Sequence, residues 1–238
     1  MYVLAARTDL IVENNKADAL NSYVFESESM IKNGVKITRL KTSTGSYSTL
    51  EVKSPEAFSS STDLISKEIT TLLPKSFKEI LVIGLGNRDI TPDSLGPLSC
   101  ERIIATRHIK ESTSRVSVLS PGVLGQTGLE VSEIISGIAE KIKPDALLII
   151  DALAARDKER ICKTIQITDS GIQPSSGVGG KRQEISQRSL GIPTIAIGVP
   201  TVTCDATEYF VSMPQNIDIL AQMLSETLAI SINEALHN

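Results

Sequence analysis

Short apolar runs alternate with helix-like segments from residue 80 onward. Helices are expected at about 94–109 and in a segment ending at 142, both with apolar residues at helical spacing, and also at about 181–190 and 215–235. The intervening runs have the length of buried strands and lie at 80–83, 116–119, 146–150, 162–168 and 193–199. This alternation is typical of an α/β protein with a parallel sheet covered on both faces. We therefore predict one three-layer α/β/α domain with a mostly parallel central sheet.

The first third of the chain has a different pattern. Residues 1–34 are polar without a sustained period, and we expect a leader followed by irregular structure. Residues 35–41 and 46–53 are β-prone runs separated by a Ser/Thr/Gly turn, which predicts a small N-terminal β-hairpin. A helix is expected to begin after Ser61 and to end before Pro74.

The most informative stretch is residues 80–97, ILVIGLGNRDITPDSLGP. Four apolar residues form a buried strand, and Gly84 and Gly86 allow the backbone to turn sharply because they lack a Cβ. Asn87 belongs to the same turn, and Asp93 follows Pro92 at an expected helix start. Asp151 directly follows another apolar run, ALLII. Both carboxylates are thus predicted at the carboxyl ends of strands, where open α/β sheets bind ligands.

Two neighbouring carboxylates have a defined chemistry. They cannot both ionise cheaply, so one keeps its proton and can act as an acid while the other acts as a base toward water. Asp93 and Asp151 would form such a pair if their strands are neighbours in the sheet. The simpler alternative is that Asp93 caps a helix and Asp151 caps a turn, since Asp is a preferred capping residue.

Composition limits the other possibilities. The chain has 238 residues, a net charge of −4, eight Phe and Tyr residues and no Trp, which argues against a nucleic-acid-binding protein. No apolar run reaches the ~20 residues of a membrane span. The three dispersed cysteines fit reduced thiols in a cytoplasm. His108 and His237 are not well placed to complete a zinc site, so we expect no metal and no cofactor, although a carboxylate site for magnesium remains an alternative.

Three further features bear on the expected site. GLGNRD carries an aspartate where the third glycine of a dinucleotide fingerprint would stand, which argues against pyrophosphate binding. The loop GVGGKR, 177–182, is a candidate for binding an anion or a substrate. Arg156 follows Asp151 closely enough to influence its ionisation.

Several long motifs occur together and in order: GLGN-x₃-TPD-x-LGP, SPGVLGQTG, DALAAR, QITDSGIQPSSGVGGKR and GIPTIAIGVPTV. In this combination the chain resembles the germination proteases of spore-forming bacteria, over roughly residues 80–205, with a weaker match at RTDLIVE. The resemblance implies the fold of hydrogenase-maturation peptidases, a homotetramer in the spore core, and an endopeptidase that degrades small acid-soluble spore proteins. It also implies an aspartic-type mechanism, with the proposed catalytic residues matching Asp93 and Asp151.

The same resemblance implies that the protein is made as a zymogen that processes itself. The family cuts after an acidic residue and before an apolar one, and Asp9–Leu10 offers that junction. We therefore expect residues 1–9 to be a propeptide and residues 10–238 to form the peptidase domain. The alternatives are a metal-dependent maturation peptidase of the same fold and a non-enzymatic module that binds a peptide or an anion.

Overall fold

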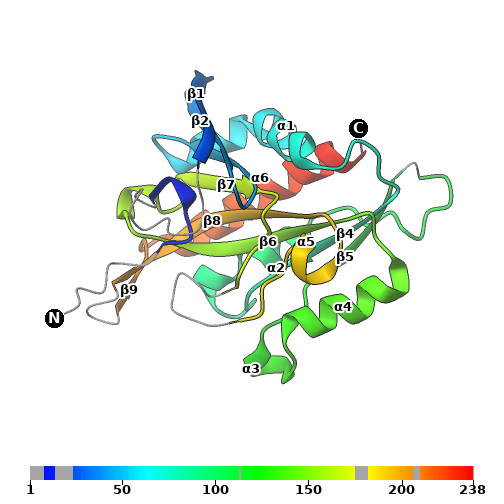
Figure 1. Cartoon of the computed structure of the whole chain (residues 1–238). Helices are drawn as coiled ribbons and strands as arrows, with labels where there is room; N and C mark the ends of the chain where they lie inside the picture. The colour runs from blue at the N-terminus through cyan, green and yellow to red at the C-terminus, as the bar shows by residue number, and fades with distance from the viewer. Residues whose placement is uncertain (1–7, 14–23, 113, 175–181, 206–209, 238) are drawn as a thin grey trace.

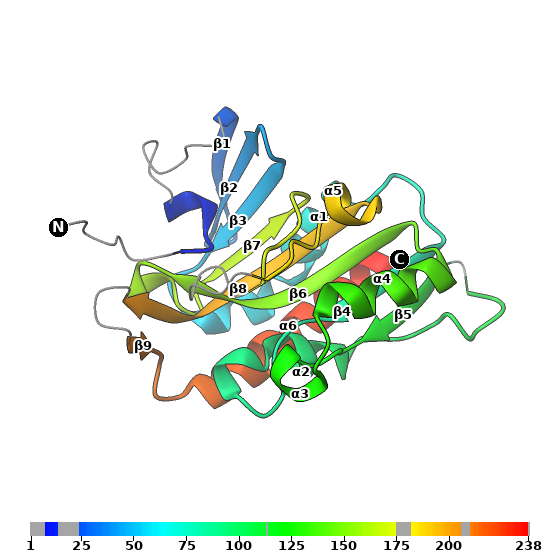
Figure 2. The same ribbon diagram turned by 60° about the horizontal axis from the view of Figure 1, so that its bottom comes forward.

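A computed structural model describes residues 8–13, 24–112, 114–174, 182–205 and 210–237 (Figure 1). Its strands form one sheet in the order β1-β2-β3-β7-β8-β6-β4-β5, with β9 paired to β8. Figure 2 shows the strands side by side in this order. The strands are β1 (Val24–Lys32), β2 (Val35–Thr42), β3 (Ser46–Glu51), β4 (Glu79–Gly84), β5 (Arg115–Leu119), β6 (Ala146–Ala155), β7 (Thr164–Thr168), β8 (Thr194–Asp205) and β9 (Phe210–Ser212).

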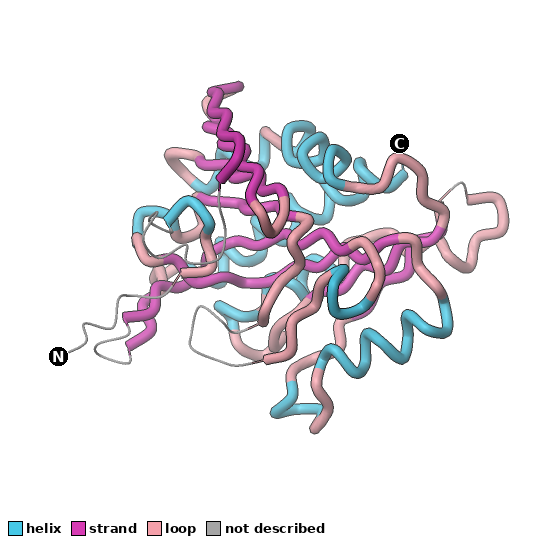
Figure 3. The backbone as a smooth tube through the Cα atoms, in the orientation of Figure 1, coloured by secondary structure: helices cyan, strands magenta, loops and turns pink. Residues whose placement is uncertain are grey.

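Helices cover both faces of the sheet, as the sequence predicted. The α-helices are α1 (Thr62–Leu72), α2 (Leu95–Cys100), α3 (Leu124–Thr127), α4 (Val131–Ile142), α5 (Gln187–Leu190) and α6 (Ile217–His237), and the short 3₁₀ helices are η1 (Ile11–Glu13), η2 (Pro55–Ser60), η3 (Thr91–Asp93) and η4 (Lys158–Arg160). Figures 1 and 3 show α1 and α6 on one side of the strands and α4 on the other.

The alternation of side chains along β4 explains the two layers. Ile80 and Val82 are buried in the larger core cluster, which α1 and α6 cover. Leu81 and Ile83 point to the opposite face and pack in the cluster that contains Ile135 of α4. A strand that buries both faces reads as a continuous apolar run, and this is why the sequence located the central strands well. The three-layer α/β/α fold is confirmed.

The direction of the strands divides the sheet into two parts. Four strands lie side by side in the order β5, β4, β6 and β8, and each of them runs parallel to the next. β7 runs antiparallel to β8 and continues through β3 and β2 to β1, each pair antiparallel. The expected hairpin, β2 and β3, is therefore part of the main sheet and not an appendage.

The expectation of irregular structure up to residue 34 was wrong for residues 24–32. These residues form β1, which pairs with β2 at the edge of the sheet. Phe25 and Ile31 are exposed, as is most of the strand, so β1 has no buried face to produce an alternating pattern. Residues 1–7 and 14–23, also within this expectation, lie outside the described residues.

Two helix boundaries also differ from the prediction. The helix expected over 94–109 ends at Cys100, because the amides of Thr106 and Arg107 donate to the Val116 carbonyl of β5 at 2.9 and 3.1 Å. Residues Thr127 to Glu130 have the sequence form of a capping box, which predicts a helix start at Thr127, but α4 begins only at Val131. Thr127 ends α3, and Gly128 takes a φ of 71° that stops the helix before α4 begins.

Candidate active site

β4 and β6, the strands that lead to the two aspartates, are direct neighbours. They pair in parallel with Gly84 opposite Ile150, and the Leu85 amide extends the ladder by donating to the Ile150 carbonyl at 2.8 Å. From β4 the chain continues to β5 on one side, whereas from β6 it continues to strands on the other side, through β7 to β8. The order of strands therefore reverses between β4 and β6. A crevice forms at such a switch point in open α/β sheets. Asp151 lies within β6, which continues to Ala155 instead of ending at residue 150.

The glycine turn holds Asp93 next to the end of β4. Gly86 has a φ of 113°, and a Cβ there would lie 2.0 Å from the Asp93 carbonyl oxygen, so no other residue fits without a shift. The Asn87 amide donates to Asp93 Oδ2 at 2.7 Å. Gly84 provides a second close approach, since its Cβ would lie 2.3 Å from the Gly96 carbonyl oxygen. The turn therefore packs β4 directly against the start of α2 and fixes Asp93 above the sheet.

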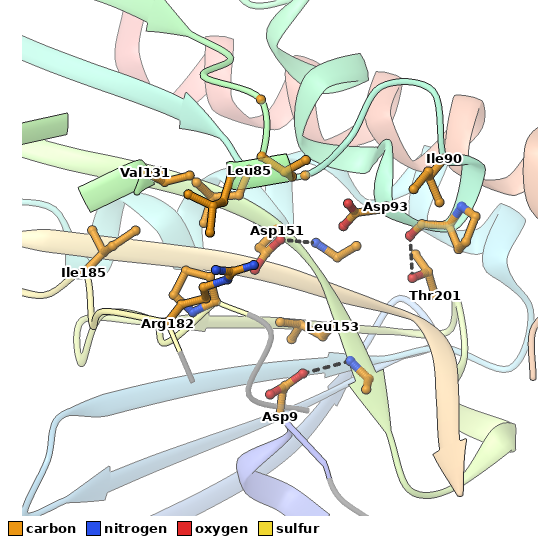
Figure 4. Close-up of a pocket in the computed structure, with 18 of the residues that line it drawn as sticks. Asp9, Leu85, Ile90, Asp93, Val131, Asp151, Leu153, Arg182, Ile185 and Thr201 are labelled. Carbon is orange, nitrogen blue, oxygen red and sulfur yellow. Dashed lines mark hydrogen bonds between the residues drawn. The ribbon is translucent and has the colours of Figure 1, made fainter. Parts of the chain in front are cut away.

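Asp93 and Asp151 line the same pocket, which has a volume of about 360 Å³. Its walls include apolar side chains such as Ile90, Leu153 and Ile185. Figure 4 shows both aspartates around this space, with Asp9 on the far side of Leu153. The structure thus brings together the two carboxylates that the motifs singled out.

Burial raises the pKa of both carboxyl groups, and neighbouring charges raise that of Asp151 further. The pKa of Asp151 is raised well above its ordinary value, first because the side chain is desolvated and then because the charges of Asp93 and Asp9 oppose its ionisation. The pKa of Asp93 is also raised by desolvation, while the bond from the Asn87 amide opposes that shift. Two acids with unequal environments can divide the roles of proton donor and proton acceptor.

Cationic and polar residues complete the pocket. Among the described lining residues, Arg182 is the one cation, and its Nη1 lies 3.3 Å from Glu130 Oε1. Arg182 is the last residue of the predicted loop GVGGKR, whose residues 177–181 lie outside the described residues. Thr201 Oγ1 donates to the Pro92 carbonyl at 2.7 Å and ties β8 to the turn before Asp93.

Asn87 and Arg156 differ in their relation to the aspartates. Asn87 contacts Asp93 through its backbone amide, whereas its side-chain Oδ1 accepts from Gln126 Nε2 at 2.9 Å and from the Asp89 amide at 3.0 Å. Arg156 does not line the pocket and is not among the causes of the Asp151 shift. Its Nη1 instead donates to the Glu13 carbonyl at 3.1 Å.

The predicted processing junction lies beside the same pocket. Asp9 lines it, and the Asp9 carboxylate accepts a hydrogen bond from the Ala154 amide at 2.9 Å. The Asp9 amide in turn donates to the Ala154 carbonyl at 3.0 Å. Leu10 is fully buried and packs in a small cluster with Leu153 and Ala155 of β6. An acidic–apolar dipeptide is therefore docked along the strand that carries Asp151.

Two contacts of this N-terminal segment were not anticipated. The Glu13 carboxylate accepts from the amides of Arg156 at 2.6 Å and Asp157 at 3.0 Å, and lies 3.3 Å from Arg160 Nε. Gln166 of β7 bonds the backbone of residues 9 and 11. No local sequence pattern predicts these contacts, because the partners lie more than 140 residues apart in the sequence.

Two further properties of the described residues concern metal binding and membrane insertion. Among the described residues, no group of three or more His, Cys, Asp and Glu side chains is arranged to hold a metal ion. None of the helices in the described ranges has the length and apolar character needed to cross a bilayer.

The fold and the pocket define an α/β protein with two acidic side chains, buried Asp151 and half-buried Asp93, at the carboxyl edge of its sheet. A sequence model described as germination protease matches residues 7–212. A germination protease from Caldanaerobacter subterraneus subsp. tengcongensis is 39% identical, with 95% of this chain and 76% of the relative covered. One from Geobacillus sp. (strain WCH70) is 51% identical, with 59% of this chain and 41% of the relative covered.

This chain belongs to the germination protease family, and the resemblance drawn from its motifs is confirmed. It spans about half the length of several curated relatives, 48% in the case of the one from Bacillus mycoides. Among solved structures, a [NiFe] hydrogenase maturation protease HycI from Thermococcus kodakarensis KOD1 is 21% identical with a TM-score of 0.42, covering 66% of this chain and 94% of that one.

Proposed function

We propose that this protein is an aspartic-type endopeptidase that begins the degradation of small acid-soluble spore proteins in the core of a germinating spore. The observation that carries the proposal is the pair Asp93 and Asp151 in one pocket, with an acidic–apolar dipeptide docked beside it. Membership of the germination protease family supports the reaction class. We also propose that the active protein is a homotetramer that needs no cofactor.

In the proposed mechanism the two aspartates have different roles. Asp151 is more deeply buried and faces both Asp93 and Asp9, so it holds its proton and acts as the acid. Asp93 accepts the Asn87 amide, which favours its ionised form, and acts as the base. Asp93 takes a proton from water as the water oxygen adds to the peptide carbonyl carbon. The C–N bond then breaks, and the leaving nitrogen receives the proton of Asp151.

The docked segment supports self-processing. We propose that residues 1–9 are a propeptide and that the protein cuts the Asp9–Leu10 bond to become active. The junction presents an acidic residue followed by a buried apolar one, which is the pattern proposed for the spore-protein substrates. Mass spectrometry of purified protein held at mildly acidic pH should detect a species that begins at Leu10. An unchanged N-terminus under every activating condition would contradict this step.

The catalytic assignment is tested with a small acid-soluble spore protein as substrate and mass analysis of the fragments. Asp93→Asn and Asp151→Asn should each lower the cleavage rate about 10²–10⁴-fold, the contribution of a general acid or base. Asp89→Asn is the matched control, because Asp89 lies in the same turn but is exposed. Circular dichroism must show that all three variants are folded. Full activity of Asp93→Asn would remove this residue from the mechanism.

A further inference from the structure

Gln166 binds the backbone on both sides of the proposed processing junction. Its side-chain Nε2 donates to the Asp9 carbonyl oxygen at 3.1 Å, and its Oε1 accepts from the Ile11 amide at 2.7 Å. The residue is 7% exposed and lies on β7, whose backbone pairs with β3 and β8. A side chain held in this way is a rigid support, because its strand cannot shift without breaking two ladders.

The second side of the junction is fixed by β6. The Asp9 amide and carboxylate are both bonded to Ala154, at 3.0 and 2.9 Å. Leu10 fills the apolar space against Leu153. Residue 9 is thus held between β6 and the side chain of Gln166, and the buried carboxylate of Glu13 anchors the segment four residues further on.

The atom that Gln166 contacts is chemically significant. If the Asp9–Leu10 bond is hydrolysed, negative charge develops on the Asp9 carbonyl oxygen. A preorganised N–H donor aimed at that oxygen stabilises the transition state more than the ground state. Its second bond, to the Ile11 amide, keeps the amide group of Gln166 from rotating and so fixes which atom faces the carbonyl.

We propose that Gln166 positions the acidic–apolar peptide bond for cleavage and donates to its carbonyl oxygen. This role rests on the proposed peptidase function and extends it to a residue on a strand other than those of the aspartate pair.

Two substitutions separate the two bonds of Gln166. Gln166→Met keeps the length of the side chain and removes both bonds, whereas Gln166→Glu keeps the acceptor for the Ile11 amide and loses the donor. Thr168→Val is the matched control, because Thr168 is also buried on β7 but bonds Ser170 instead of the N-terminal segment. All variants are made in the full chain.

Hydrogen–deuterium exchange, in the uncleaved Asp93→Asn background, measures the contact itself. In Gln166→Met the Ile11 amide should exchange about tenfold faster, consistent with the loss of one buried hydrogen bond. In Gln166→Glu it should stay protected, and the amides of Ile165 and Ile167 should be unchanged in both variants. Equal loosening of all these amides, or no change at Ile11, would show a merely structural role and overturn the proposal.

Cleavage kinetics measure the chemical role. Appearance of the species that begins at Leu10 should slow by about 10²-fold in both Gln166 variants, the typical loss of one donor to a developing oxyanion, and should stay near wild type in Thr168→Val. A wild-type or faster rate in Gln166→Met would overturn the role. If the wild type cleaves spore protein but never its own junction, the assignment fails while the peptidase function stands. If it cleaves neither, the proposed function fails as well.

Discussion

Replacing Asp151 with Asn should stabilise the protein at neutral pH. Asp151 is 7% exposed, and its ionised form is opposed by desolvation and by two neighbouring carboxylates. A carboxyl group whose pKa is raised by folding binds its proton more tightly in the folded state than in the unfolded chain. Its contribution to stability is therefore complete below the ordinary Asp pKa and is lost as the pH rises through the raised value.

The size of the effect follows from the burial of the charge. Each unit by which folding raises a pKa corresponds to about 1.4 kcal/mol of stability lost above that pKa. Incompletely compensated buried polar groups cost about 1–3 kcal/mol, and charged ones more. Asn cannot ionise, and its side-chain oxygen can still accept from the Ala152 amide, which Asp151 does at 2.9 Å. We therefore expect a gain of about 1–3 kcal/mol at pH 7.5 that vanishes near pH 3.5.

Urea unfolding of both proteins from pH 3.5 to 8 provides the measurement. The wild-type stability should fall across this range relative to the variant, and the two curves should converge at the acidic end. Asp89→Asn should differ from wild type by less than about 0.5 kcal/mol at every pH, since Asp89 is exposed. Parallel curves, or a variant that is less stable at pH 7.5, would refute the argument. A variant that is more stable but inactive would show that the ionisable side chain at residue 151 lowers stability and is needed for activity.

Two further perturbations follow from the geometry of the pocket. Gly86→Ala should destabilise the protein by about 1–3 kcal/mol in urea unfolding and lower the cleavage rate, because its Cβ would lie 2.0 Å from the Asp93 carbonyl oxygen and its φ is 113°. Gly125→Ala, where a Cβ meets nothing within 4 Å, is its control and should stay within about 0.5 kcal/mol of wild type. Glu13→Ala should speed hydrogen exchange at Leu10 at least about fivefold, since it leaves the amides of Arg156 and Asp157 without their acceptor and removes one of the carboxylates paired with Arg160. Unchanged exchange there would show that residue 13 does not hold the segment.

The sequence predicted the central strands because each is buried on both faces and therefore reads as an apolar run. It also located the glycine turn, where only a residue without a Cβ fits against Asp93. The edge strand β1 was not predicted for the opposite reason. Both of its faces are largely exposed, so its sequence shows no alternation of apolar and polar residues. The direction of β7 was equally hidden, because a buried strand has the same composition whether it runs parallel or antiparallel to β8.

By itself, then, the sequence determined which segments are buried and where the chain turns. It also showed that an aspartate follows each of two apolar runs. Only the tertiary structure placed β4 beside β6, so that Asp93 and Asp151 face one pocket. It also brought Asp9 onto β6 and Gln166 onto the backbone of the N-terminal segment. These contacts join residues more than 50 positions apart through the order of strands in the sheet, which the packing of the whole core selects and no local pattern records.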